Sequence, residues 1–161
     1  MANGIFNISL GRGIELHNRV VNNDPANAGL VVLFLKVAEA DATLQDYATL
    51  GAILAEAGNT EADFTNYARK VLTDADISAA VVDNVNNRYE ADIPDQTFVD
   101  AGGASNNTLV KLLVCYDPDT TAGDDTAIVP LAHLDYAETT TGSSIVAQIN
   151  VAGYYRASQP A

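Results

Sequence analysis

The sequence predicts an α+β fold in which N-terminal helices pack against an antiparallel β-sandwich or a barrel-like half. Three observations favour this fold class. Apolar residues recur at helical spacing within the first 60 residues, short strand-like runs separated by Gly, Asn, Asp and Pro follow them, and two runs are apolar on both faces. The 161 residues fit a single domain, with a helical part over about 1–60 and a β-rich part over about 61–161.

Two helices are expected in the N-terminal part. The first covers residues 9–21, where one face is formed by Leu10, Ile14, His17 and Val21. Two glycines weaken this pattern, because each costs about 1 kcal/mol relative to alanine in a helix. The second helix covers residues 43–57. Its apolar stripe is formed by Leu44, Tyr47, Leu50, Leu54 and Ala57.

Strands are expected on both sides of the second helix. Residues 30–35 and 109–116 are continuous apolar runs, which indicates strands that are covered on both faces. Residues 64–72 fit either a helical turn or a strand. Further strands, bounded by turn residues, are predicted over 79–83, 87–93, 96–99, 127–136 and 144–151.

The charge excludes two classes of partner. The net charge is −13, and the eight lysines and arginines are scattered along the chain. Nucleic-acid binding requires clustered cations that neutralise phosphates, and anionic membrane surfaces repel an acidic protein. The longest apolar run is far too short to span a membrane, and the N-terminus lacks a signal-peptide pattern. We therefore expect a protein made in a cytoplasm, with no nucleic-acid partner and no membrane partner.

Few side chains indicate catalysis or a bound cofactor. Cys115 lies inside an apolar run, where cysteine usually behaves as a small buried hydrophobic residue. His17 and His133 lack the spacing of zinc ligands and belong to no recognisable catalytic motif. The sequence therefore predicts that the protein is not an enzyme and that it holds no cofactor.

An acidic turn offers the main alternative to this view. The carboxylates of Asp117, Asp119, Asp124 and Asp125 could supply the oxygen ligands that hard cations prefer. The turn departs from the calcium-loop pattern, however, because Ala122 stands where that pattern has a glycine. We therefore predict a solvated turn between two strands and no metal site.

Several short segments resemble proteins of tailed bacteriophages. Residues 66–73 read NYARKVLT, which resembles a recurring segment of small tailed-phage virion structural proteins, where it precedes a β-rich half with an Asp-rich turn. Residues 1–9, 23–25, 59–64 and 129–131 fit the same resemblance. The resemblance implies a structural protein of the capsid decoration, or head accessory, type.

The resemblance also implies where the protein acts and with what. It implies a cement protein that is made in the host cytoplasm and binds the outer surface of the assembled capsid, with the major capsid protein and copies of itself as partners. A homo-oligomer on the particle is expected. One alternative is a structural component of the tail or of a fibre. Another is a receptor- or carbohydrate-binding module that uses Tyr89, Tyr154 and Tyr155.

The candidate site is a subunit interface near the C-terminus. Tyr154, Tyr155 and Arg156 combine two aromatic rings with a cation in an acidic chain. Tyrosine and arginine are enriched where interfaces carry most of their binding energy. We expect one tyrosine and Arg156 to contact a neighbouring subunit, and the alternative is that the tyrosines close the core of their own domain.

Overall fold

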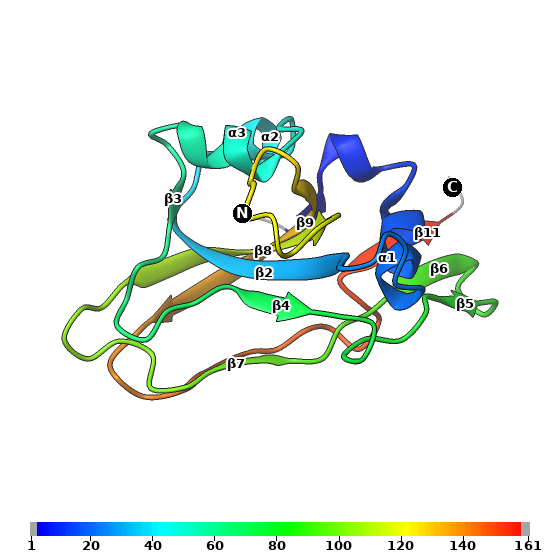
Figure 1. The fold of residues 1–161 in the computed structure, drawn as a ribbon. Coiled ribbons are helices and arrows are strands. Elements are labelled where there is room, and N and C mark those ends of the chain that lie inside the picture. The colour runs from blue at the N-terminus through cyan, green and yellow to red at the C-terminus, as the bar shows by residue number, and fades with distance from the viewer. Residues whose placement is uncertain (1–2, 159–161) are drawn as a thin grey trace.

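The computed structural model describes residues 3–158 and shows a fold that is mostly β. Within this range the chain forms eleven strands, three short α-helices and one 3-10 helix. The strands build three antiparallel sheets (Figure 1). The predicted α+β fold, with N-terminal helices packed against a sandwich or barrel, is therefore wrong.

The largest sheet contains six strands and forms the centre of the molecule. Its order is β1-β9-β8-β2-β3, and β4 also pairs with β2. The pairing of β2 with β8 runs without interruption from Gly29 opposite Asp117 to Leu35 opposite Lys111. The six strands are β1 (Gly4–Ile5), β2 (Gly29–Val37), β3 (Thr60–Glu61), β4 (Lys70–Leu72), β8 (Thr108–Asp117) and β9 (Val129–Thr139).

Two smaller sheets cover part of one face of the central sheet. One pairs β7 with β10, and the other has the order β11-β6-β5. The second of these lies at one end of the molecule, beside the first α-helix (Figure 1). The strands are β5 (Val81–Asp83), β6 (Arg88–Ala91), β7 (Gln96–Phe98), β10 (Ile145–Ala147) and β11 (Tyr155–Ser158).

Both faces of β2 and β8 are covered, as the two apolar runs predicted. Successive side chains of a strand point to opposite faces of the sheet. Leu30 and Phe34 therefore face a larger core, which includes residues of α1 (Gly13–Val21) and of the two smaller sheets. Val31 and Leu33 face a second core, which includes residues of α2 (Asp41–Leu44) and α3 (Leu50–Ala55).

The first predicted helix is only partly confirmed. Asn7–Ser9 forms a short 3-10 helix, and α1 begins at Gly13. Leu10, which we expected on the apolar face, precedes α1 and is 61% exposed. Gly13 sits against the ring of Tyr155, where an added Cβ would lie 2.2 Å from the ring. Close packing of the ring therefore explains a glycine that helix propensity disfavours.

The predicted continuous helix over 43–57 is wrong, because the segment forms two short helices. The carbonyl of Gln45 accepts a hydrogen bond from the amide of Asn7, so it is engaged outside the helix. The helix restarts at Leu50, where the Thr49 side chain accepts from the amide of Ala52 at 3.2 Å. The amide of Leu50 donates to Ile128. Contacts with distant segments therefore divide the helix.

The fold class differs from the prediction because the N-terminal part is not a helical layer. Its longest buried element is β2, which pairs with β8 from the other half of the chain. Residues 64–72, which fitted either element, end in strand β4. The other strands were predicted with shifts of a few residues, except β1, β3 and β11, which we did not predict. None of the helices within residues 3–158 is long and apolar enough to cross a membrane.

Single carboxylates in the central sheet should prevent folding. Leu33 and Val114 are fully buried on opposite faces of the sheet. We expect Leu33→Asp and Val114→Asp each to abolish soluble expression, because a buried carboxylate without a partner is among the most destabilising single changes. Val37→Asp is the control, since Val37 lies on the same strand as Leu33 but is 46% exposed. Soluble yields equal to that of the Val37→Asp protein would contradict the assignment of these cores.

Candidate functional site

The two predicted interface tyrosines lie inside the protein. Tyr154 is 5% exposed and Tyr155 is 2% exposed. The hydroxyl of Tyr155 donates to the carbonyls of Ser9, at 2.7 Å, and Leu10, at 3.0 Å. The hydroxyl of Tyr154 lies 3.2 Å from Nδ1 of His17. Both rings therefore close the core of their own domain, as the alternative interpretation had it.

Arg156 is the exposed member of the predicted site. Its Nε donates to the carbonyl of Ala152 at 2.9 Å, and it lies on β11 directly opposite Glu90 of β6. A contact of this segment with a neighbouring subunit stays a prediction. Of the three predicted residues, Arg156 is the one exposed enough to make this contact. Deleting the chain from Gly153 would remove β11 and both buried rings, so such a deletion would test folding rather than attachment. Residues 159–161, which follow this segment, lie outside the described residues.

The burial of these rings also bears on the carbohydrate-binding alternative. That alternative depended on Tyr89, Tyr154 and Tyr155 as exposed contacts. Tyr89 lies on β6 and is partly exposed, but the other two rings offer no surface to a sugar.

Exposed apolar side chains gather on a hairpin that the sequence analysis did not single out. The hairpin consists of β5, β6 and the turn between them, residues 81–91, and we call it the valine hairpin. Val81 is 64% exposed, Val82 58% and Val85 89%. It projects at the end of the molecule that also holds α1 and β11 (Figure 1). Val81 and Val82 are successive strand residues and therefore lie on opposite faces of the hairpin. Exposed apolar side chains gathered on one projecting element often mark protein–protein contact sites.

The charges of the valine hairpin are paired within the hairpin. Arg88 contacts Asp83, with Nε 3.2 Å from Oδ2, and it also contacts Glu90. Asp83 additionally accepts hydrogen bonds in the turn, and these lower its pKa. The exposed valines therefore stand beside two carboxylates that share one arginine, and this pairing lowers the cost of covering the surface.

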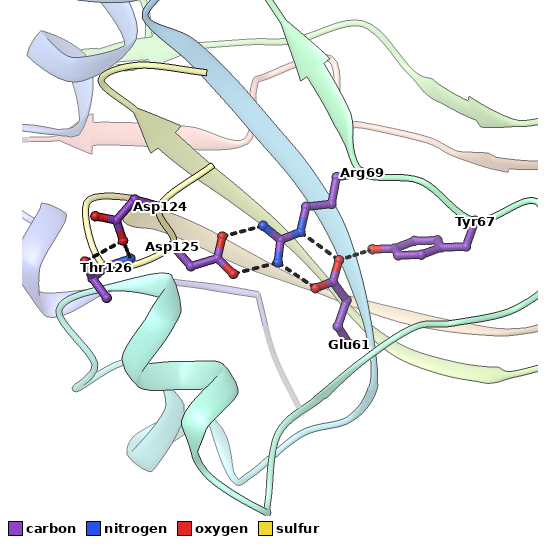
Figure 2. Close-up of polar contacts among 6 residues, drawn as sticks. All are labelled: Glu61, Tyr67, Arg69, Asp124, Asp125 and Thr126. Carbon is purple, nitrogen blue, oxygen red and sulfur yellow. Dashed lines mark hydrogen bonds and ion pairs between the residues drawn. The ribbon is translucent and has the colours of Figure 1, made fainter. Parts of the chain in front are cut away.

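The acidic turn is bound by Arg69, an arginine that lies far from it in the sequence. Arg69 binds both carboxylate oxygens of Asp125, at 2.5 and 2.9 Å (Figure 2). It also binds both oxygens of Glu61, at 2.7 and 2.8 Å, and the hydroxyl of Tyr67 donates to Glu61 at 2.9 Å. Planar, two-point pairing of this kind is the strongest geometry available to arginine. Arg69 thus ties β3 and the start of β4 to the acidic turn.

The remaining carboxylates of the turn serve the turn itself. Asp119 accepts from the amide and hydroxyl of Thr121, and Asp124 accepts from those of Thr126 (Figure 2). These hydrogen bonds lower the pKa values of both carboxylates. Burial instead raises the pKa of Asp117, which accepts from the amide of Asp119. Within residues 3–158, no group of three or more His, Cys, Asp or Glu side chains could hold a metal ion.

A buried lysine is the main polar feature that the sequence analysis missed. Lys111 lies within β8 and is fully buried, with Nζ 2.6 Å from Asp41 and 2.5 Å from Asp135. We had treated residues 109–116 as an apolar run, although a lysine inside such a run signals a buried cation that requires carboxylates. The triad joins α2 to β8 and β9. Its partners come from distant segments, so their identity could not be read from the sequence.

The cysteine and the two histidines are buried. Cys115 is fully buried, as predicted, and burial raises the pKa of its thiol. His17 bonds the carbonyl of Ser78 at 2.8 Å, and burial lowers its pKa. His133 is 1% exposed, and neither of its ring nitrogens has a hydrogen-bond partner among residues 3–158. Burial, and then the nearby Lys111, lower the pKa of His133.

Removing Arg69 should destabilise the protein far more than removing a carboxylate of the same turn. Arg69→Ala leaves Glu61 and Asp125 close together without a cation, and we expect it to lower the stability by about 2 kcal/mol, less than for a fully buried pair because these groups are partly exposed. Thermal melts measure the change. Asp124→Ala is the matched control and should melt close to the wild type, with or without calcium. A wild-type Tm that rises on addition of calcium would contradict the structural role of this turn.

Stability should fall as the pH drops below neutrality. The folded protein holds His17 and His133 with pKa values below the ordinary 6.5, so the unfolded chain binds more protons in acid. Their contribution is complete above about pH 6.5 and is lost as the pH falls from there. His133→Leu removes two ring nitrogens without partners, so it should raise the Tm more at about pH 5.5 than at about pH 7.5.

Measuring the His133→Leu protein and the wild type at both pH values provides the control for this prediction. Asp92 and Asp117, whose pKa values burial raises, oppose the histidines at lower pH and are unchanged by His133→Leu. A His133→Leu protein with the same pH dependence as the wild type would contradict a neutral, buried imidazole.

Comparison with known proteins found no relative of this chain. Neither family models, nor curated proteins, nor solved structures match the chain. The resemblance to phage virion proteins therefore stays a prediction from short segments. The arrangement of the side chains is what supports a function.

Proposed function

We propose that the protein is a non-enzymatic structural subunit that decorates the outer surface of a tailed-phage capsid. The valine hairpin carries this proposal. It places three exposed apolar side chains at one end of a molecule whose net charge is −13. A cement protein needs such a surface to bury against the shell, while its remaining acidic surface stays in solvent.

The distribution of polar side chains supports a structural role. Lys111, Arg69 and Arg88 each join segments of the fold through carboxylates. His17 is bonded to the backbone and to a tyrosine, and Cys115 is packed in the core. These groups hold the domain together, and a rigid domain is what a repeated subunit on a lattice requires. Many copies on one particle allow a modest interface to hold firmly.

The proposal is tested by changing the valine hairpin and measuring attachment to the capsid. Val81→Thr, Val82→Thr and Val85→Thr together keep the β-branched shape but replace exposed methyl groups with hydroxyls. We expect the apparent Kd for capsids stripped of the protein to rise at least about tenfold, because apolar contact is lost at each position. Co-sedimentation with these capsids measures the Kd.

A matched variant distinguishes this surface from a general effect of the substitutions. The control variant combines Val99→Thr with Val146→Thr and so makes the same chemical change elsewhere. Val99 directly follows β7 and is 60% exposed, and Val146 lies on β10 and is 47% exposed. This control should bind like the wild type. Equal binding by the hairpin variant would contradict the proposed attachment surface. Density for the subunit at the tail in cryo-EM maps of intact particles would replace decoration with the tail or fibre alternative.

A further inference from the structure

A groove of about 750 Å³ runs along the β1 edge of the central sheet, and no strand among residues 3–158 pairs with the outer side of this edge. β1 is the last strand in the order of this sheet and forms one wall, and the segment before β11 forms the other. Ile5, Leu134 and Ile149 supply apolar surface, and Ile149 is held in place by its amide, which donates to Asp95 at 2.7 Å. Polar side chains line the same groove and are contributed by Asn3, Asp135, Gln148, Asn150 and Arg156.

The wall formed by β1 offers backbone hydrogen-bonding groups to the groove. Residues of an antiparallel strand alternate between those that bond to the neighbouring strand and those that point away from it. The amide of Phe6 donates to the carbonyl of Leu131 on β9, at 3.1 Å. The register places Ile5 opposite Ala132, one position along, so the N–H and C=O of Ile5 point away from β9. An extended chain can pair with such an edge.

The other wall carries a cation that has no acidic partner in the described structure. Within residues 3–158 no carboxylate lies at ion-pair distance from Arg156, and Glu90 opposite it is bound by Arg88 instead. Asp135, which also lines the groove, is bound by Lys111 at 2.5 Å. The chain has 21 acidic residues, yet Arg156 has no carboxylate partner among residues 3–158. Its position beside the groove therefore favours a carboxylate that belongs to a bound molecule.

We propose that this groove binds an extended peptide segment of a partner protein, which adds to the edge of β1 and places a carboxylate against Arg156. The backbone edge at Ile5 selects an extended conformation, the apolar surface takes alternate side chains, and Arg156 selects an acidic residue. A second copy of the chain is disfavoured as the source, because two molecules of net charge −13 repel each other. The inference goes beyond capsid decoration, since it concerns a different surface from the valine hairpin.

A synthetic probe tests the groove without knowledge of the natural partner. The probe is a blocked eight-residue peptide of alternating threonine and valine with one central glutamate, and its twin carries glutamine instead. Titration into the isotope-labelled full-length protein should shift the amide resonance of Ile5, with a Kd of about 1 mM for the glutamate peptide. Arg156→Gln should weaken the glutamate peptide about tenfold and leave the glutamine peptide unchanged.

Arg12→Gln is the matched control. Arg12 is also exposed and also donates Nε to a backbone carbonyl, that of Ile8, but it does not line the groove. The proposal is overturned if the two peptides bind equally well to the wild type, or if the Ile5 amide does not move at saturation. Concentration-dependent dimers that Arg156→Gln abolishes would also overturn it, because the groove would then hold a second copy. None of these measurements depends on capsids, so they separate this proposal from the decoration function.

Discussion

The pairing of β2 with β8 is the constraint on which the rest of the structure depends. Both strands are buried on both faces, so their backbone groups have no access to water and must bond to neighbouring strands. β9 continues the sheet beyond β8, while β3 and β4 bond to successive parts of β2. The side chains on the two faces then define the two cores. A fully buried leucine or phenylalanine contributes about 1.5–3 kcal/mol to stability, and β2 alone supplies several.

The scarcity of cations shapes the remainder of the molecule. Eight lysines and arginines face 21 acidic residues, and two of these cations, Lys111 and Arg69, join segments that are distant in sequence. Lys111 connects β8 and β9 to α2, Arg69 connects β3 and β4 to the acidic turn, and Arg88 closes the valine hairpin. Carboxylates are therefore organised around a few positive charges. The carboxylates that are not paired with a cation give the surface its acidic character. Uncharged contact surfaces are therefore limited to small areas.

Two such areas are proposed as contact surfaces, and they differ in physical character. The valine hairpin exposes apolar side chains at its turn and, because Val81 and Val82 are successive strand residues, on both of its faces, which suits burial against a partner protein. The groove beside β1 combines a free backbone edge with Arg156, which suits one extended chain. The hairpin and the groove share the second small sheet, because β5 and β6 form the hairpin and β11 carries Arg156.

The sequence by itself determined the elements whose pattern of apolar side chains indicates directly that they are buried. The runs over 30–35 and 109–116 were predicted as strands covered on both faces, and Cys115 was predicted as a core residue, because apolar side chains, interrupted only by Lys111, leave no solvent-facing alternative. Turn residues likewise placed most of the short strands to within a few residues. The absence of clustered cations was also visible in the sequence alone.

Tertiary structure decided what depends on distant partners. The segment 43–57 has helical periodicity, but the bond between Asn7 and Gln45 and the anchoring of Leu50 to Ile128 divide it. Tyr154 and Tyr155 look like interface residues until the carbonyls of Ser9 and Leu10, and the glycine at position 13, are brought against them. The same holds for Arg69 and Lys111, whose carboxylate partners lie up to 70 residues away along the chain. Periodicity describes a residue's neighbours in sequence, whereas burial and pairing are set by neighbours in space.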